Sequence, residues 1–289
     1  MQITLTDDID RFTATAGSWL AESPVQNNVL LTTIAAQRAG NAKGTGPATY
    51  GWVTDAGVIV GAMRWPPPLQ ARITAMPDAA AAALAAELAA RATPLPGING
   101  PRHTVAVFAA RWQELTGRAV GSVRDLLISR LDEVRLTQWP PGRMRQAEPS
   151  EAGLLVTWVG QVFVEAGMPS PELAARQQVG EQMSGGRLFV WEDDGRPVAV
   201  TGCSAPVEGV VRMTGGYTPP EHRTSWYGTA LSAAVAGHFL SQGCLACITI
   251  SDNSSPHGAA GLRMVGYRPV LELSECRFHP VSEPAVPAH

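Results

Sequence analysis

The sequence is nearly devoid of lysine. Lys43 is the only lysine among 22 basic residues, so the other 21 are arginines, and they stand against 25 acidic residues. The resulting formal net charge of −3 gives no overall attraction to nucleic acid. Together with the alanine-rich tract at 79–91, the preference for arginine is typical of GC-rich coding rather than of a binding device.

Cysteine is scarce as well. The four cysteines, Cys203, Cys244, Cys247 and Cys276, are too few and too scattered for a disulfide framework. Cys244 and Cys247 have the spacing of a metal-binding knuckle, but no second pair accompanies them and they enter a β-rich stretch. We therefore favour core thiols over a zinc site and expect no metal.

Long apolar runs are missing too, since none approaches the ~20 residues that a membrane helix needs. The N-terminus, MQITLTDDIDRF, is acidic and lacks the apolar core of a signal peptide. We expect a cytoplasmic protein without membrane contact. With 289 residues, of which 45% are hydrophobic, the chain is long enough for one large domain or two modest ones.

The two halves of the sequence share an order of predicted elements. Prolines and a glycine at 138–142 interrupt regular structure and predict a linker. On each side of it, two strands joined by a tight turn precede a third strand, an alanine-rich helix and a closing strand. The predicted ranges are 50–53, 58–63, 71–75, 79–92 and 126–131 in the first half, and 188–191, 197–203, 210–217, 224–241 and 273–278 in the second. We therefore predict two domains, 1–137 and 143–289.

The second half contains four further predicted elements. Pro149 begins a helix whose apolar residues follow helical spacing, and a second helix covers about 171–183. A buried strand is predicted at 244–251 and a short helix at 256–265.

The turn before the helix at 224–241 is the best candidate for an anion-binding site. A helix N-terminus presents free backbone N–H groups and the positive end of the helix dipole. In the stretch RTSWYGTAL (223–231), Gly228 permits close approach of a ligand, and Thr229 offers a hydroxyl for capping or for a phosphate. Taken alone, this pattern is common at helix starts.

Four stretches of the second half together resemble the GNAT superfamily of acyl-CoA N-acyltransferases, and more narrowly the bacterial proteins that join two GNAT units. They are WEDDGRP (191–197), YTPPEHR (217–223), RTSWYGTAL (223–231) and the segment 252–270, which ends in GYRPV. The resemblance implies an α/β (α+β) fold of two tandem units, each with a mixed, largely antiparallel sheet flanked by helices.

The resemblance also implies an activity: transfer of an acyl group, most simply acetyl from acetyl-CoA, to the amine of a small-molecule acceptor. The family's turn reads Arg-x-x-Gly-x-Gly/Ala, and its backbone N–H groups hold the CoA pyrophosphate. The first half lacks such a turn before its long helix, so we expect it to be a degenerate unit with a structural or substrate-covering role.

The sequence departs from the family pattern where the donor is handled. Trp226 stands at the middle glycine of the turn, where an indole must point away or block the groove. Leu262 stands where the family commonly has a tyrosine that protonates the CoA thiolate, four residues before Gly266. Ser255 takes the place of a common asparagine, and it retains the ability to form a hydrogen bond.

These departures leave three hypotheses. The first is an acyl-CoA transferase with a weakened site. The second is a transferase of the same fold that uses another donor, such as aminoacyl-tRNA, to form an amide bond. Seven arginines against four acidic residues between 111 and 145 favour contact with tRNA phosphates, although a solvated surface is the simpler interpretation. The third is a non-catalytic binding protein on a GNAT scaffold.

The resemblance assigns candidate roles to particular residues. The candidate donor-binding residues are Tyr217, Thr218, Arg223, Thr224, Ser225, Trp226, Gly228, Thr229 and Ser255. Arg223 is the best candidate for phosphate contact, because the motif and the helix-start chemistry agree on it.

The candidate catalytic groups are Asp252, His257 and Glu165. Asp252 ends a buried strand, His257 lies at a helix start, and Glu165 ends the first helix of the second half. The simpler interpretations are an Asx cap, a solvated cap and an exposed carboxylate, respectively.

Overall fold

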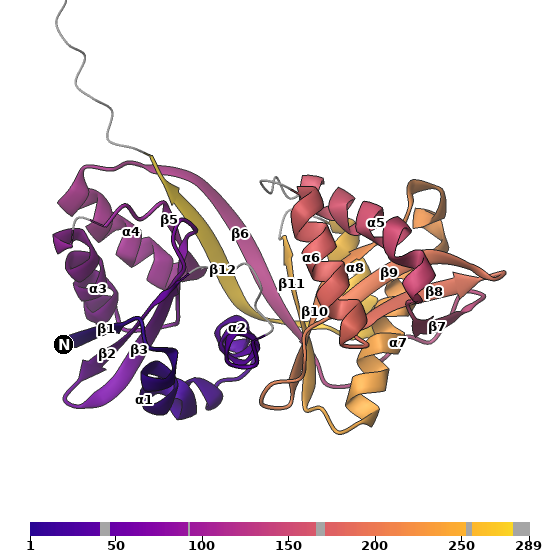
Figure 1. Cartoon of the computed structure of the whole chain (residues 1–289), viewed down its shortest axis with the longest axis horizontal. Helices are drawn as coiled ribbons and strands as arrows, with labels where there is room; N and C mark the ends of the chain where they lie inside the picture. Colours follow the sequence, from indigo (N-terminus) through magenta and orange to yellow (C-terminus); the bar gives the residue numbers. More distant parts are fainter. Residues whose placement is uncertain (41–46, 92, 166–170, 253–255, 280–289) are drawn as a thin grey trace, which may run out of the picture. The chain divides into compact units, whose positions relative to one another are not determined.

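The computed structural model describes residues 1–40, 47–91, 93–165, 171–252 and 256–279, with the side chains of 256–259 excepted. The chain forms two compact units. Unit 1 consists of Met1–Leu126 together with the chain from Leu271 onward, and unit 2 consists of Leu127–Val270. Figure 1 labels their helices and strands.

Ten elements make up the first repeat of the chain. In order they are β1 (Gln2–Thr6), α1 (Ile9–Ala21), α2 (Asn28–Arg38), β2 (Thr49–Asp55), β3 (Val58–Trp65), β4 (Ala71–Ile73), α3 (Asp78–Ala90), β5 (Gly97–Pro101), α4 (Arg102–Thr116) and β6 (Val120–Leu131).

The second repeat has the same order, with a 3₁₀ turn before its first and its third helix. It consists of β7 (Arg143–Gln146), η1 (Pro149–Glu151), α5 (Ala152–Glu165), α6 (Pro171–Ser184), β8 (Leu188–Asp193), β9 (Arg196–Cys203), β10 (Val210–Tyr217), η2 (Pro220–Ser225), α7 (Tyr227–Ser241), β11 (Ala246–Asp252), α8 (Pro256–Val265) and β12 (Arg268–Phe278). The predicted repetition of elements is therefore confirmed.

The closing strands differ from the sequence expectation. We expected each half to end on its own last strand, but β12 pairs antiparallel with β5, from Leu273↔Pro101 to Arg277↔Gly97. Strands β6 and β12 contribute residues to both units. The strand order is β1-β2-β3-β4-β5-β12-β6 in unit 1 and β12-β6-β11-β10-β9-β8-β7 in unit 2. The compact units therefore differ from the sequential ranges 1–137 and 143–289 in where these two strands belong.

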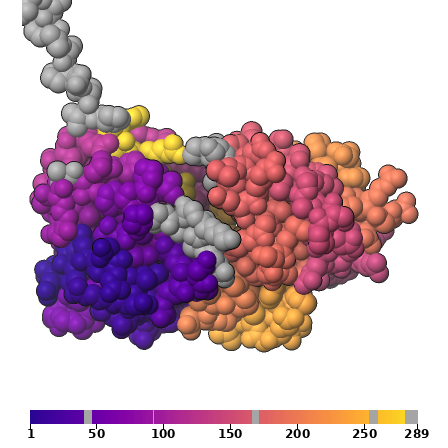
Figure 2. All heavy atoms as spheres, viewed as in Figure 1, coloured from indigo at the N-terminus to yellow at the C-terminus, as the bar shows by residue number. Residues whose placement is uncertain are grey.

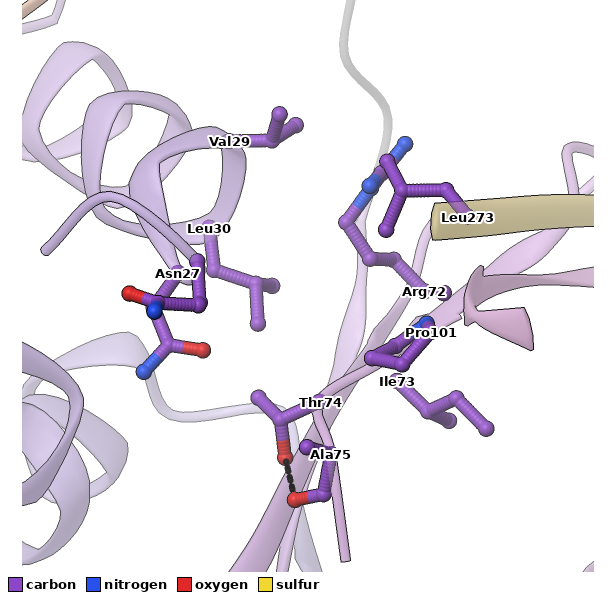
Figure 3. Close-up of a pocket in the computed structure, with 11 residues that line it drawn as sticks. Asn27, Val29, Leu30, Arg72, Ile73, Thr74, Ala75, Pro101 and Leu273 are labelled. Carbon is purple, nitrogen blue, oxygen red and sulfur yellow. Dashed lines mark hydrogen bonds between the residues drawn. The ribbon is translucent and has the colours of Figure 1, made fainter. Parts of the chain in front are cut away.

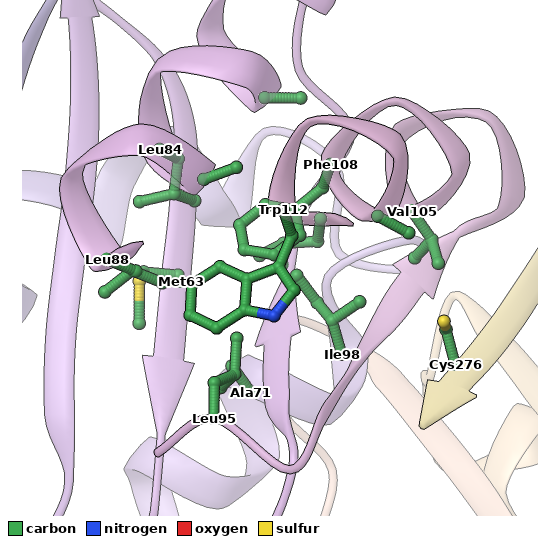
Figure 4. Close-up of a cluster of buried hydrophobic side chains, with 14 of the residues drawn as sticks. Met63, Ala71, Leu84, Leu88, Leu95, Ile98, Val105, Phe108, Trp112 and Cys276 are labelled. Atoms are coloured by element: carbon green, nitrogen blue, oxygen red, sulfur yellow. The ribbon is translucent and has the colours of Figure 1, made fainter. Parts of the chain in front are cut away.

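The core of unit 1 lies between its sheet and the helices α3 and α4. Trp112 of α4 is almost completely buried there, and its ring stacks on Phe278 with centroids 5.6 Å apart. Figure 4 shows that Cys276 of β12 also points into this cluster. On the opposite face Phe12 of α1 packs against Tyr50 of β2 at 5.2 Å.

The sheet of unit 2 is covered on both faces because its strands alternate. In β8, Val190 packs with Leu155 and Val179 of the helices α5 and α6. Phe189, one residue earlier, faces α7 and meets Phe239 edge-on at 6.2 Å. In Figure 2 the helices α5 and α6, in rose and salmon shades, form a large part of the visible surface of unit 2, beside later segments in orange.

The predicted linker at 138–142 has no regular secondary structure, as expected. Trp139 stacks on Trp191 with centroids 6.2 Å apart, and the Trp191 indole N–H donates to the carbonyl oxygen of Pro141 at 2.8 Å. The segment is therefore held against unit 2. Among the helices formed by described residues, none has the length and apolar character to cross a membrane.

Candidate functional site

The candidate site of unit 2 lies where two parallel strands separate. β10 and β11 pair in register from Val210↔Ala246 to Arg212↔Ile248. Beyond these pairs β10 continues to Tyr217 and β11 to Asp252. The separation opens the sheet at the carboxyl ends of both strands, which is where ligands bind in α/β proteins.

A cavity of about 350 Å³ fills this opening. Its described lining is a mixture of hydroxyl-bearing, aliphatic and glycine residues, and among them are Thr214, Thr218, Thr229, Thr249 and Ser251. None of the described lining residues carries an ionisable side chain, so the cavity offers hydroxyl and backbone hydrogen bonds in an otherwise apolar setting.

Unit 1 has a corresponding pair of strands, but their opening is closed. β4 and β5 pair in parallel from Ala71↔Ile98 to Arg72↔Asn99. The cavity beside them measures only about 20 Å³, close to the volume needed for one water molecule. Figure 3 shows Leu30 of α2 pointing toward the end of β4 from across this space.

Gly100 adds to this closure. A Cβ atom at Gly100 would lie 2.5 Å from the Ile73 carbonyl oxygen, so the two strands stay in close contact beyond their last registered pair. The expectation that the first repeat is degenerate stays a prediction, and this geometry supports it.

One boundary of the cavity is the start of α7. Gly228 and Thr229 line the cavity from the first turn of this helix, and Thr218 lines it from the end of β10. A Cβ atom at Gly228 would lie 2.7 Å from the Thr218 hydroxyl, so a glycine keeps these two segments close. The first intrahelical bond is Ala230 N–H to the Trp226 carbonyl, which leaves the preceding N–H groups for a ligand.

Trp226 adopts the backbone conformation of a glycine. Its φ of 61° lies in the left-handed region, and it separates η2 from α7. The indole is 53% exposed and does not contribute to the described lining of the cavity. The side chain of Trp226 therefore leaves the cavity open.

Arg223 is held at the rim of the site by groups of the chain itself. Its Nε donates to the Thr218 carbonyl oxygen at 3.2 Å, and its guanidinium lies 5.8 Å from the centroid of the Tyr217 ring. Glu165, at the end of α5, lies 3.7 Å from it as an exposed ion pair. The structure thus brings Tyr217, Thr218, Arg223 and Glu165 together.

The remaining predicted residues are more dispersed. Thr224 is exposed and Ser225 is partly exposed within η2, and Asp252 is half-buried at the end of β11. Ser255 and the side chain of His257 lie outside the described residues. Leu262 lines the cavity from α8.

The sequence analysis missed a β-bulge at the centre of the site. β10 pairs with β9 at Thr214↔Gly202 and Tyr217↔Val200, so one extra residue lies in β10 at Gly215 and Gly216. A bulge leaves a backbone N–H group outside the strand ladder. Two adjacent glycines inside a predicted strand were the signal that indicates such a bulge.

The cysteines of unit 2 behave as core thiols. Cys203 and Cys247 are buried, and desolvation raises the pKa of both thiols to about 12, so they stay protonated at neutral pH. Cys244 is only partly buried. In the described part of the chain, no group of three or more metal-binding side chains is assembled.

The arginines between 111 and 145 are largely occupied within the chain. They pair with groups of the chain itself, among them Arg111 with Glu114, Arg118 with the carbonyls of Leu95 and His279, Arg130 with Asp132, Arg135 with Glu133, Arg143 with Glu192, and Arg145 with Glu151 and Glu192. This pairing supports the solvated-surface interpretation of the cluster.

The overall fold has close counterparts among solved structures. An acetyltransferase of the GNAT family from Colwellia psychrerythraea matches with a TM-score of 0.64 and 11% identity, over 96% of this chain and 100% of that one. A GCN5-related N-acetyltransferase from Sphaerobacter thermophilus matches at 0.56 and 16% identity, over 84% and 85% of the two chains. The chain therefore has the fold of the GNAT superfamily.

The tandem arrangement is matched as well. A tandem GNAT protein from the clavulanic acid biosynthesis pathway superposes with a TM-score of 0.60 and 16% identity, over 98% of this chain and 100% of that one. The predicted tandem GNAT fold is thus confirmed. No protein-family model and no curated protein matches the sequence.

Proposed function

We propose that the chain is an N-acyltransferase that takes its acyl group from an acyl-CoA, most simply acetyl-CoA, in the cavity of unit 2. The observation that carries this proposal is the separation of β10 and β11 around a cavity of about 350 Å³ that reaches the start of α7. An extended thioester arm fits such an opening, because the unpaired strand edges offer backbone hydrogen bonds along its length.

The start of α7 supplies the site for the donor's phosphates. Its free N–H groups and helix dipole favour an anion, and Gly228 keeps the backbone accessible. Arg223 adds a positive charge at the rim, although it already contacts Thr218 and Glu165. We expect Thr224, Ser225 and Thr229 to contribute hydroxyl contacts here.

The bulge at Gly215 and Gly216 provides the means of catalysis. An acyl-CoA supplies an activated thioester, which an amine attacks directly. The chain holds the two reactants in line and directs a backbone N–H group from the bulge at the carbonyl oxygen. Asp252, His257 and Glu165 remain candidates for receiving the proton of the amine.

Because of Leu262, the proposed reaction lacks a general acid for the departing thiolate at this position. A leucine cannot protonate the departing thiolate, and loss of such an acid costs roughly 10²–10⁴-fold in rate. A thiol ionises near pH 8.5, so its anion leaves without assistance, only more slowly. We therefore expect a slow transferase rather than an inactive one.

Calorimetry with acetyl-CoA tests the proposal. We expect saturable binding at a single site and a higher melting temperature in its presence. Gly228→Leu should abolish binding by filling the cavity, whereas Gly180→Leu on α6, where a Cβ meets no neighbour, is the matched control. Arg223→Ala should weaken binding, with the exposed Arg176→Ala as its control.

Transfer itself is measured as thiol release from acetyl-CoA with a panel of amino acid amides, polyamines and amino sugars. No binding of any acyl-CoA at millimolar concentration would contradict the proposal. Salt-sensitive binding of charged tRNA would replace it with the alternative donor. Tight binding of an acyl-CoA without any transfer would leave the binding-protein hypothesis.

A further inference from the structure

Thr214 links the candidate cavity to helix α6. Thr214 is one of the residues that line the cavity, one position before the bulge, and its hydroxyl oxygen accepts a 2.6 Å hydrogen bond from the Gln182 amide nitrogen. Gln182 belongs to α6 and is only 4% exposed. A buried glutamine therefore fixes the hydroxyl of a residue that lines the cavity.

A glycine on the neighbouring strand makes this contact possible. Gly202 of β9 is the direct partner of Thr214 in the sheet. A Cβ atom at Gly202 would lie 2.1 Å from the Gln182 amide oxygen, so any other residue would displace the glutamine. The side chain of Gln182 thus lies flat on the sheet over Gly202 and reaches Thr214.

The hydrogen bond determines which way the Thr214 proton points. Because the Thr214 oxygen accepts from Gln182, its own proton is available to another acceptor, and Thr214 is one of the residues that line the cavity. The Gln182 amide oxygen is buried and has no hydrogen-bond partner among the residues that the structure describes. Burial of an unpartnered acceptor is unfavourable, and such costs concentrate at functional sites.

We infer that Thr214 donates a hydrogen bond to the acyl carbonyl oxygen of the donor, and that Gln182 is the positioning residue that orients it. This inference rests on the proposed function of the same cavity. In the transfer, the amine nitrogen bonds to the acyl carbon, the C–S bond breaks, the thiolate keeps the electron pair, and the proton of the amine passes to one of the candidate bases named above or to water. The Thr214 hydroxyl and the bulge N–H share the negative charge that develops on oxygen.

Isosteric substitution separates this role from packing. Thr214→Val keeps the shape and removes the hydroxyl, and we expect kcat to fall about 10²-fold while binding of acetyl-CoA changes little. Thr214→Ser should restore most of the activity. Gln182→Glu replaces the amide donor with an oxygen that attracts the Thr214 proton, so kcat should fall although every hydroxyl is retained. Gln177→Glu, exposed on the same helix, is the control.

The infrared carbonyl band of bound [1-¹³C]acetyl-CoA gives a readout that does not require turnover. Donation by Thr214 lowers the stretching frequency, so Thr214→Val and Gln182→Glu should both shift the band upward, and Gln177→Glu should not. An unshifted band together with wild-type kcat in Thr214→Val would overturn the inference while leaving the proposed function intact. Failure of the wild-type protein to bind acetyl-CoA would overturn both.

Discussion

Trp226 combines a bulky side chain with a left-handed backbone. Side chains with a Cβ cost about 1–2 kcal/mol in this conformation, and the indole recovers little of that because it is 53% exposed. The residue nevertheless leaves the start of α7 in the shape that the turn requires. Strain of this kind persists where the surrounding structure determines it, here between η2 and α7.

Trp226→Gly should therefore stabilise the protein by about 1 kcal/mol, because relief of the left-handed strain outweighs the destabilising increase in unfolded-state entropy that glycine brings. The measurement is the urea midpoint at constant slope. Trp226→Ala retains a Cβ and hence the strain, so it should not show the gain. Equal midpoints for the glycine and alanine variants would contradict this account.

Leu262 marks the second departure from the family pattern, and it does line the cavity. We expect Leu262→Tyr to raise kcat for acetyl transfer about tenfold or more, because a phenol at this place can protonate the thiolate. Leu262→Phe adds the same ring without the hydroxyl and should not raise kcat. A comparison of kcat for the two variants with a thiol-release assay decides whether the hydroxyl acts.

At the scale of elements, an ion-pair network attaches strand β7 to the elements around it. Arg145 of β7 bonds to Glu151 in η1 at 2.7 Å and also forms a close ion pair with Glu192 of β8. Hydrogen bonds from Arg145 lower the pKa of both carboxyl groups from the usual value of 4.5. Stability gained in this way is fully present above the unfolded-state pKa and is lost as pH falls through the lowered values.

Arg145→Met should consequently make the stability of the protein less dependent on pH in the acidic range. The wild-type urea midpoint should fall as the pH drops below the usual carboxyl pKa of 4.5, whereas the variant should start lower and change less. Arg176→Met, which breaks an exposed pair with Glu172, serves as the control and should keep the wild-type dependence. Parallel curves for wild type and Arg145→Met would show that the network contributes nothing.

Many of these elements could be predicted from sequence, because the information for them is local. A short apolar run at 188–191 and the turn at Asp194–Gly195 define the hairpin of β8 and β9, and the predicted helix 256–265 matches α8. The Gln182–Thr214 contact could not be predicted, because it joins residues 32 positions apart through a gap left by Gly202. Hydrophobic periodicity contains no trace of such a polar contact.

At the scale of the whole molecule, the last strands of the two repeats are shared between the units. The sequence shows that each repeat ends in a strand but does not show its partner, because strand pairing depends on long-range contacts. In the structure, Phe278 of β12 lies in the core of unit 1 and stacks on Trp112. The stability of the first unit therefore depends on residues at the far end of the chain.

Phe278→Ala should destabilise unit 1 by about 3–5 kcal/mol, since it removes a large buried side chain from a packed core. Hydrogen exchange should show faster amide exchange in α3, α4 and β5. Arg277→Ala, exposed on the same strand, should leave these rates unchanged. Faster exchange confined to unit 2 would contradict the assignment of β12 to the core of unit 1.

The location of the donor site is the central claim, and a crystal structure with bound acetyl-CoA tests it most directly. We predict that the pantetheine arm lies between β10 and β11, with the pyrophosphate at the start of α7 and the acyl carbonyl beside Thr214 and the bulge. Acetyl-CoA between β4 and β5 of unit 1, or nowhere in unit 2 at saturating concentration, would contradict the account.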